Sequence, residues 1–508
     1  MPTINDYKKA TLKNWGFTGT IQDMENKWLK SWVTPYTGAT NDMWMKFLYN
    51  RGFLVGPISY RQNLWLSSLG YTGPLPNKFY QFWKNGGGTG AWAAGANISY
   101  DFTKNSLPNG PGPFTFTDTH STDILYPNSA GLYTTAGANV ITRSDLGLQT
   151  VPTRTNLSLY SNDLSNASWA VMAASKTSGQ TDFLGGTGAG LITADGTSAL
   201  HISIASTSSV AYTSGTVYAL SRIVKAGTQS LVQLIPPSTA FGGTAYANFN
   251  LSGAGSVTQS AGLVASGITA LANGWYQIWA VASASASVSA TGGSVAFIST
   301  TTDARAPSNT LTTTFFDFGG QVEAGSFATP LIITAGTSAT VNGNQQVISG
   351  LGTQLATGVA GLVQMNILSP YGVANRLLEF NDGTGLNAFY MYQSSSTNIA
   401  VDVFSGGVSQ GVLQQAVDNT GLLTIAFVVA NNYYTWRVVG QSANAPDTNM
   451  PNGYPVMDRL ALLSRGFDTS RNAYGFTRKL ALDFLTPSDD PATKFAYWYN
   501  QAVLAAAS

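Results

Sequence analysis

From residue 155 onward, the chain consists of short runs in which apolar and polar residues alternate, each ended by a cluster of Gly, Ser, Thr or Asn. Runs at 215–227, 273–283 and 312–325 follow this pattern. Alternation with a period of two places side chains on opposite faces of a strand, and the closely spaced turn residues exclude long helices. Many short strands separated by turns are typical of sandwiches and jelly rolls. We therefore predict two β domains, at 155–335 and 336–508.

Few residues of this chain are charged. Charged residues make up 10% of the sequence, against about 25% in ordinary soluble proteins. The apolar fraction is an ordinary 44%, and the net charge is +1. Disorder requires low hydrophobicity with high net charge, so the composition excludes a disordered chain. It also gives no basic field for binding nucleic acid.

Cysteine is absent, so neither disulfides nor thiolate chemistry is available. The opening stretch "MPTINDYKKATLKNW" has no apolar core of a secretory signal, and we expect synthesis in a cytoplasm. No stretch reaches 18 uninterrupted apolar residues, and we expect no membrane insertion.

Residues 1–86 contain a repeat of another kind. Four glycines recur at spacings of 17 to 19 residues, and an aromatic residue stands nine positions after each. The glycines are Gly19, Gly38, Gly56 and Gly73, and the aromatic residues are Trp28, Phe47, Trp65 and Phe82. Glycine suits a turn, and an aromatic residue two helical turns later closes an apolar face. We predict four short helices packed as a small bundle.

The same 86 residues carry ten Lys and Arg against four Asp and Glu. Two interpretations stand: a solvated helical surface, or a basic module that docks onto a larger assembly. The glycine-rich stretch 85–95 is expected to be a flexible joint. We predict that residues 87–154 form a Gly/Pro-rich extended connector between this module and the β domains.

Glu323 is the strongest candidate for a catalytic acid, since the chain has only two other glutamates, Glu25 and Glu379. A glycosidase needs two carboxylates about 5–10 Å apart. The nearest acids in sequence, Asp303 and Asp317, have unremarkable turn or strand settings. Because a proline that cannot join a central ladder follows at 330, we interpret Glu323 as a strand-end residue and predict no catalytic residue.

Metal and cofactor motifs are also missing. The two histidines, His120 and His201, are far apart, and we expect His120 to lie in a solvated loop. Asp382 and Asp447 lie in turn-rich stretches that could offer oxygens to Ca²⁺, although turn chemistry explains both. The glycine run 185–190 lacks the Lys-Ser/Thr of a phosphate loop. We predict no metal and no cofactor.

Five motifs occur in one order: "RTNLSLYSNDLSNASW", "IVKAGTQS", "FNLSG", "ALANGWYQI" and "GGQVEAGSFATPLI". Together they resemble the carbohydrate-module-like jelly roll of many bacteriophage virion proteins, notably tail and head fibres. The match departs from the family pattern at 220–227, where a Ser and an aromatic residue usually precede the Lys. The end of the chain, 472–505, resembles the closing strand and helix of concanavalin-like or laminin-G-like sandwiches, with Ser488 expected to cap that helix.

These resemblances imply a mainly β, non-enzymatic virion protein, a tail or head fibre or decoration protein. Residues 1–86 would anchor it to tail, collar or capsid proteins, and the β domains would face a host-surface glycan. Fibres of this kind are commonly homotrimers, assembled in the bacterial cytoplasm. Two alternatives remain: a virion-associated polysaccharide depolymerase and a cellular surface adhesin.

Overall fold

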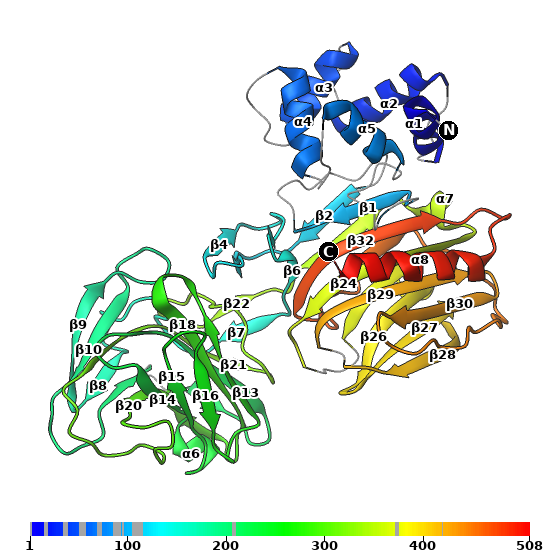
Figure 1. Ribbon diagram of the computed structural model, residues 1–508. Helices are drawn as coiled ribbons and strands as arrows, with labels where there is room; N and C mark the ends of the chain where they lie inside the picture. The colour runs from blue at the N-terminus through cyan, green and yellow to red at the C-terminus, as the bar shows by residue number, and fades with distance from the viewer. Residues whose placement is uncertain are drawn as a thin grey trace. The chain divides into compact units, whose positions relative to one another are not determined.

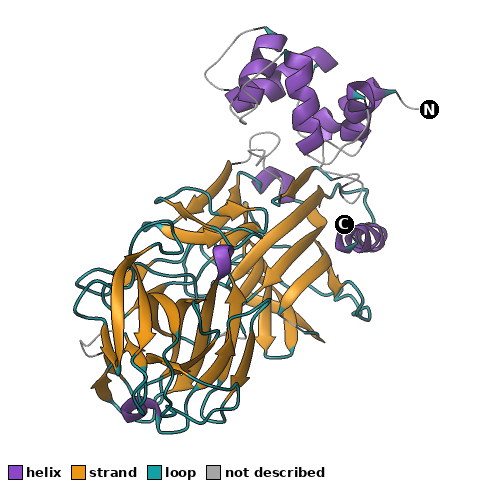
Figure 2. Ribbon diagram, turned by 60° about the vertical axis from the view of Figure 1, so that its left-hand side comes forward, coloured by secondary structure: helices purple, strands orange, loops and turns teal. Residues whose placement is uncertain are grey.

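The computed structural model describes residues 3–14, 19–33, 39–49, 57–68, 74–84, 93, 96–103, 115–205, 210–370, 375–418 and 420–507. Strands dominate, and short helices occupy the N-terminal part (Figure 2), so the predicted mainly β class with an N-terminal helical bundle is confirmed. The chain divides into two compact units. Unit 1 contains 1–120, 139–152 and 343–508, and unit 2 contains 121–138 and 153–342. In the sequence, unit 2 therefore consists of two segments that lie between the three segments of unit 1.

The helical module has five helices among its described residues, one more than predicted. They are α1 (Ile4–Asn14), α2 (Ile21–Val33), α3 (Thr40–Tyr49), α4 (Ile58–Ser68) and α5 (Leu75–Lys84). Each helix contacts its neighbours in sequence, and α1 also contacts α5. The array therefore closes on itself, since the first helix contacts the last.

The repeated glycine and aromatic residues did not indicate the additional helix, α1, because Thr11 stands where the other repeats have an aromatic residue. In α1 the repeat is visible in the capping residues at the start of the helix. Thr3 N–H donates to Asp6 Oδ2 at 2.7 Å, and Asp6 N–H donates to Thr3 Oγ1 at 3.3 Å. Thr20 and Asp23 make the same reciprocal pair at α2. Such a box satisfies two of the free N–H groups at a helix start.

The rest of unit 1 is a sandwich of two seven-stranded antiparallel sheets (Figure 1). The first sheet has the order β30 (Tyr433–Val438), β29 (Gly421–Ala430), β24 (Gly358–Ile367), β32 (Gly475–Phe484), β6 (Gly147–Thr150) and β5 (Arg143–Ser144), with β1 (Ile98–Asp101) also on β32. The second has the order β2 (Thr115–Thr119), β23 (Gln345–Ser349), β31 (Arg459–Leu462), β25 (Arg376–Asn381), β26 (Ala388–Ser395), β27 (Asn398–Ser405) and β28 (Val408–Ala416). The main apolar core lies between them, beside the short α7 (Gly352–Leu355).

Four strands of this sandwich, β1, β2, β5 and β6, come from the stretch predicted as a connector. β5 pairs with its neighbour β6, whereas β1 and β6 pair with β32, and β2 pairs with β23. Their partners follow more than 200 residues later in the chain, and nothing in the local sequence pattern indicated this pairing. Residues 98–101, 115–119 and 147–150 are thus part of the sandwich itself.

The helix α8 (Pro491–Ala506) covers the outer face of the first sheet, over β24 and β29 (Figure 1). Trp498 is fully buried in that contact. The expected cap, Ser488, is wrong: Asp490 is the N-cap and its side chain accepts from Thr493 N–H at 2.9 Å. The helix starts at Pro491, whose missing N–H costs nothing at the first position, so the residue directly before it is the one placed to cap.

Unit 2 is a sandwich of two six-stranded antiparallel sheets around a second core. One sheet has the order β17 (Ala265–Ala270), β18 (Trp275–Ser283), β13 (Val217–Ala226), β21 (Thr314–Ala324), β10 (Ala189–Ala194) and β9 (Ala174–Gln180). The opposite sheet has the order β16 (Ser256–Gln259), β15 (Ala247–Asn250), β14 (Leu231–Ile235), β20 (Ser294–Phe297), β11 (Ile202–Ile204) and β8 (Ala170–Met172). The remaining elements are β3 (Ile124–Pro127) with β4 (Tyr133–Ala136), β7 (Arg154–Asn156) with β22 (Ala339–Val341), β12 (Val210–Tyr212) with β19 (Val288–Ala290), α6 (Ser238–Phe241) and the 3₁₀ turn Ala272–Gly274.

Candidate functional site

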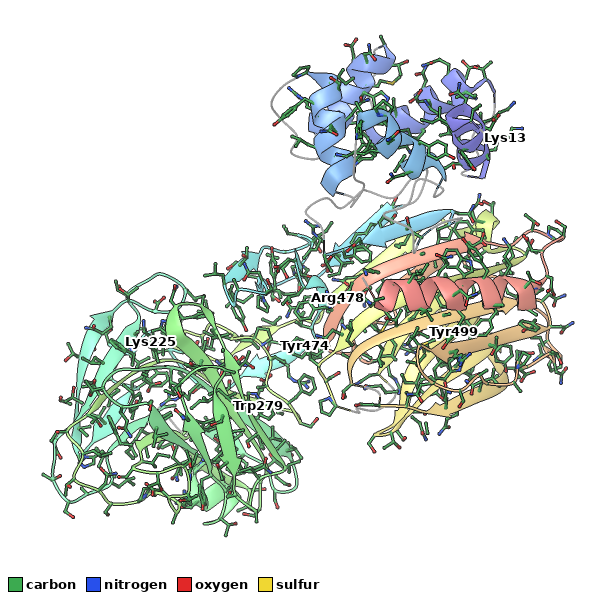
Figure 3. The ribbon with its side chains drawn as sticks, viewed as in Figure 1. Lys13, Lys225, Trp279, Tyr474, Arg478 and Tyr499 are labelled. Carbon is green, nitrogen blue, oxygen red and sulfur yellow. The ribbon has the colours of Figure 1, made fainter. Side chains whose placement is uncertain are left out.

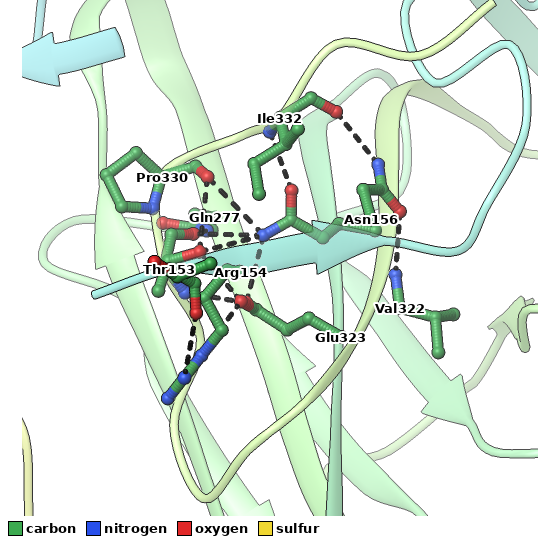
Figure 4. Close-up of polar contacts among 10 residues, drawn as sticks. Thr153, Arg154, Asn156, Gln277, Val322, Glu323, Pro330 and Ile332 are labelled. Atoms are coloured by element: carbon green, nitrogen blue, oxygen red, sulfur yellow. Dashed lines mark hydrogen bonds and ion pairs between the residues drawn. The ribbon is translucent and has the colours of Figure 1, made fainter. Parts of the chain in front are cut away.

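Glu323 lies one residue before the end of β21 and is completely buried (Figure 4). Its Oε1 accepts from Thr329 N–H at 2.8 Å and from Gln321 Nε2 at 2.9 Å. Its Oε2 accepts from Thr329 Oγ1 at 2.8 Å and lies 3.5 Å from Arg154 Nε. Burial raises the pKa of Glu323, while the Thr329 N–H and the Arg154 charge oppose that rise.

Apart from Arg154, the side chains around Glu323 are neutral, and they form hydrogen bonds with backbone groups. Gln277 Nε2 donates to Thr329 O at 2.9 Å, and Gln321 Oε1 accepts from Ile332 N–H at 2.7 Å. Asn156 bridges Ile332 O and Val322 N–H in the same network (Figure 4). No second carboxylate takes part among these contacts. The network therefore pins the segment that follows β21 onto the sheet.

A buried ion pair joins the two sheets of unit 2. Arg222 on β13 lies 3.2 Å from Asp317 on β21, and both side chains are at most 1% exposed. Ser203 on β11, in the opposite sheet, donates its hydroxyl to the same carboxylate at 2.5 Å. Burial raises the pKa of Asp317, and the Arg222 charge opposes it. Sequence reasoning missed this pair, although Arg222 lies in the stretch that departs from the family pattern.

The other sequence candidates are structural. Asp303 closes a turn by accepting from Ser299 N–H at 2.7 Å. The expectation that His120 is solvated is wrong: it is 3% exposed, with Nε2 2.9 Å from Val140 O, because the loop folds over it. Asp382 accepts from Thr384 and Asn387, and Asp447 from Asn449 and Tyr434. Among the described residues, no three His, Asp or Glu side chains are grouped to hold a metal.

The aromatic residues predicted in the repeats form the core of the helical module. Trp28, Phe47, Trp65 and Phe82 are each at most 2% exposed, and Phe47 and Trp65 have ring centroids 5.2 Å apart. Gly19 has a φ of +120°, a conformation that favours glycine. Gly38, Gly56 and Gly73 lie outside the described residues. Among the bases of this module whose side chains the structure describes, Lys9, Lys13 (Figure 3), Lys27 and Lys46 are exposed.

The outer face of β25–β28 differs from all these sites because its aromatic rings are partly exposed. On this face Glu379, Tyr390, Asp402 and Val412 stand opposite one another across the four strands. Tyr392 and Phe404 flank this row. We call Arg376, Glu379, Tyr390, Tyr392, Asp402 and Phe404 the tyrosine face. The intervening residues of β26, Phe389 and Met391, are fully buried in the core.

The tyrosine face is held by charged contacts beneath its rings. Arg376 Nε donates to Glu379 Oε2 at 2.7 Å, and its guanidinium carbon lies 3.6 Å from the Tyr390 ring centroid. The Tyr390 hydroxyl donates to Asp402 Oδ2 at 3.1 Å, and the Ser409 hydroxyl donates to Asp402 Oδ1 at 2.7 Å. Burial raises the pKa of both carboxyls, against the Arg376 charge at Glu379 and the Ser409 hydroxyl at Asp402.

Sequence reasoning named Glu379 but assigned it no role, and it did not single out the two tyrosines. The available signal was the alternation in "NAFYMYQSS", which places Tyr390 and Tyr392 on one face and Phe389 and Met391 on the other. Which face would meet water depended on the sheet's partners, and local sequence does not contain that information.

Comparison with known proteins gives only distant structural likenesses. No protein-family model and no curated protein sequence matches the chain. Among solved structures, the Ruminococcus gnavus IT-sialidase CBM40 bound to α2,3-sialyllactose aligns with a TM-score of 0.23 and 13% identity, over 28% of this chain and 84% of that one. Mouse laminin α1 domains LG4-5 align with a TM-score of 0.21 and 11% identity, over 53% and 82%. Sheep galectin-11 gives 0.18 and 14%, over 28% and 96%. These scores are too low to carry an argument, so the sandwich descriptions rest on strand order alone.

Among the described residues, no helix combines the length and apolar character needed to cross a membrane.

Proposed function

We propose that this chain is a non-enzymatic adhesive protein of a bacteriophage virion, a tail or head fibre or decoration protein that binds a host-surface glycan. The observation that carries the proposal is the tyrosine face, which offers partly exposed rings beside the Tyr390 and Ser409 hydroxyls. Aromatic rings stack on the apolar faces of sugar rings, while neighbouring acceptors take the hydroxyl hydrogens. The ordered motifs that resemble phage fibre jelly rolls supply the virion assignment.

The arrangement of carboxylates favours binding over cleavage. A glycosidase needs one carboxyl group to protonate the leaving oxygen and a second to attack or to activate water, both in contact with the sugar. Glu323 and Asp317 are completely buried, and Glu379 and Asp402 are 1% and 6% exposed beneath the tyrosines. The depolymerase alternative would require these groups to emerge from their donors.

The test uses purified protein and the capsular polysaccharide and lipopolysaccharide of the bacterium from which the particles come. We expect retention of the polysaccharide without new reducing ends. Release of reducing ends that stops in Glu323→Gln or Glu379→Gln, but survives substitution of His120 and His201, would establish the depolymerase instead. A protein that neither binds these glycans nor occurs in purified particles contradicts the proposal.

Attachment to the particle is assigned to residues 1–86, the closed and basic helical module. A fusion of these residues to a fluorescent protein is expected to copurify with particles, while the chain lacking them is not. The matched control is the same fusion with Lys9→Glu and Lys13→Glu, since both side chains are exposed. If the shortened chain is incorporated into particles and the fusion is not, the chain attaches through its β domains and not through residues 1–86.

We also propose a homotrimer, because a surface with so few charges suits burial between subunits. Light scattering at micromolar concentration is expected to give three times the chain mass of 53.5 kDa. A monomer would restrict any trimer to assembly on the particle.

A further inference from the structure

We infer that helix α4 presents the surface through which the helical module attaches to the particle, and that this surface fits an acidic protein groove with an apolar interior. The inference rests on the proposed attachment through residues 1–86, and it names the face and the class of partner. Two residues on the outer side of α4 carry it. They are Tyr60, which is 52% exposed, and Leu64, which is 38% exposed.

Tyr60 and Leu64 lie on the side of α4 that faces away from the core of the module. They are four residues apart, so their side chains are neighbours on one face of the helix. Trp65 and Leu66 are at most 2% exposed and belong to the core. Among the side chains of the module that the structure describes, Tyr60 and Leu64 are the large apolar residues that stay exposed. α4 is therefore apolar on two sides, whereas a helix needs one apolar side to close a bundle.

Tyr60 also differs from the other aromatic residues of the module, because no other ring packs against it. Tyr7 and Tyr80 have ring centroids 5.7 Å apart, and those of Trp44 and Phe79 are 6.1 Å apart. Among the described residues, Tyr60 has neither a ring contact nor a hydrogen bond. Tyrosine is one of the residues that contribute most to protein interfaces, since its ring enters an apolar pocket while its hydroxyl finds a polar partner.

The charges near α4 indicate which partner fits. Residues 43–100 contain no Asp or Glu. The bases in the part of this stretch that belongs to the module are Lys46, Arg51, Arg61, Lys78 and Lys84. Arg61 directly follows Tyr60 in α4, and Lys78 on α5 donates to Asn63 Oδ1 on α4 at 2.9 Å. The exposed apolar pair therefore lies on a helix that carries basic charge.

The four acids of the module lie on the other helices. Asp6 and Asp23 accept hydrogen bonds in the caps of α1 and α2. Glu25 on α2 forms an ion pair with Lys8 on α1, with 2.6 Å between Oε2 and Nζ. Asp42 lies in the first turn of α3, where the helix dipole favours an acid. α4 and its neighbour α5 carry bases and no acid.

An acidic protein groove fits α4 better than the other occupants. A second copy of the chain, related by a two-fold axis, would place the basic face against itself, where like charges repel. Nucleic acid offers phosphates to the bases, but its backbone has no apolar pocket for Leu64. A groove with Asp or Glu at its rim and apolar side chains within it pairs with the bases and covers both exposed residues.

The experiment uses particles assembled from a genome that lacks this gene, in a host that supplies full-length variants. We expect Tyr60→Ala with Leu64→Ala to lower the number of copies per particle at least about tenfold, as for residues at the centre of an interface. Tyr60→Phe keeps the ring and should lower it less. The control is Ser59→Ala, an exposed position of α4 beside this face, which should attach like the unchanged chain. The unfolding midpoint of the purified double variant should not fall, because both side chains lie outside the core.

Salt gives a second readout of the partner's charge. Purified full chain is added to particles that lack it, and its retention should weaken as the NaCl concentration rises. Arg61→Glu should weaken retention further, whereas Arg61→Gln should reduce the dependence on salt. Retention that is indifferent to salt and to both Arg61 variants would overturn the acidic partner.

The remaining outcomes separate this inference from the proposed attachment. Normal attachment of the double variant, in particles that exclude the chain lacking residues 1–86, would overturn the α4 surface and leave attachment through the module intact. Attachment of the chain lacking residues 1–86 would overturn both. Retention of the full chain on DNA-cellulose that is lost in Tyr60→Ala would assign α4 to nucleic acid instead. Self-association that is lost in the same variant would assign it to a second copy.

Discussion

The two sandwiches of this protein place their charged groups differently. Unit 2 directs Arg222 and Asp317 inward, where the pair is completely buried and also bonded to Ser203 in the opposite sheet. Unit 1 places Arg376 and Glu379 on the outside of a sheet, beneath tyrosines that are partly exposed. The same chemical pair thus links two sheets in one unit and supports a surface in the other.

This difference indicates which unit tolerates change. Burial of an ion pair costs several kcal/mol of desolvation per ion, and the attraction between the two ions offsets this cost. When one partner is lost, the other charge stays buried and its desolvation cost is no longer offset. The Arg376–Glu379 pair is also largely buried, with side chains 9% and 1% exposed, but Arg376 keeps more contact with water than Arg222 does, so we expect loss of one partner to cost less there. We therefore expect the inner charges of unit 2 to control folding and the outer charges of unit 1 to control binding.

The largest expected effect is that of Arg222→Ala. Removal of the cation leaves Asp317 buried without its partner, and we expect unit 2 to lose about 3–5 kcal/mol of stability. Hydrogen exchange at the amides of β13 and β21, followed during urea unfolding, measures this loss separately from unit 1. The double variant Arg222→Met, Asp317→Leu removes both charges and should recover most of the loss. Equal destabilisation by the single and the double variant would contradict the role given to the charge.

A neutral counterpart in unit 1 sharpens the comparison. Asn344 is fully buried; its Nδ2 donates to Asp118 Oδ1 at 3.0 Å and to Gln149 O at 2.9 Å, and its Oδ1 accepts from Val151 N–H at 2.8 Å. It thereby joins the two stretches of unit 1 that flank the long insertion. We expect Asn344→Ala to cost about 1–3 kcal/mol, the penalty of unsatisfied buried polar groups. The same exchange measurement, read at β23 and β6, checks it, and a loss larger than that of Arg222→Ala would reverse the ranking.

How much of the fold could be predicted from the sequence depends on how far apart in the chain the interacting residues are. Alternation and turn residues predicted strands correctly because both act within a few residues. The pairing of β1 with β32 joins residues 98–101 to 479–482, so no local pattern indicated it. Helices α2 to α5 were visible through their aromatic residues, whereas α1 was visible only through its cap.

The candidate site was less predictable than the fold. Glu323 attracted attention by its rarity, yet its role depends on Thr329 and Arg154, and only folding brings Arg154 to it. The tyrosine face depends on four strands in register, with the charged pair behind them. A sequence shows that Tyr390 and Tyr392 share a face, but not that no helix of the described part of the chain covers this face as α8 covers the other sheet.

The covering helix itself supplies a smaller prediction. Asp490 caps α8, and we expect Asp490→Ala to cost about 1 kcal/mol, the usual effect of losing an N-cap. Because α8 covers only the first sheet, exchange should rise in β24 and β29 and stay unchanged in β26 and β27. The neighbouring variant Ser488→Ala is the control, since its hydroxyl bonds Thr486 rather than the helix. An equal loss in both variants would place the cap elsewhere.

The smallest expected effect is that of Glu323→Gln, and its sign separates a structural carboxyl from a catalytic one. Burial raises the pKa of Glu323 above its ordinary 4.5, so the ionised form is disfavoured in the folded chain. The stability that this group contributes is therefore fully present below 4.5 and is lost as the pH rises through the raised value. Glutamine cannot ionise, so the variant should equal or exceed the unchanged chain in stability at pH 8 and lose that advantage as the pH falls toward 4.5. Urea midpoints across this range measure the crossing. A Gln variant that is less stable at pH 8 than at pH 5, relative to the unchanged chain, would mean that the ionised carboxylate is what holds Thr329 and Arg154 in place.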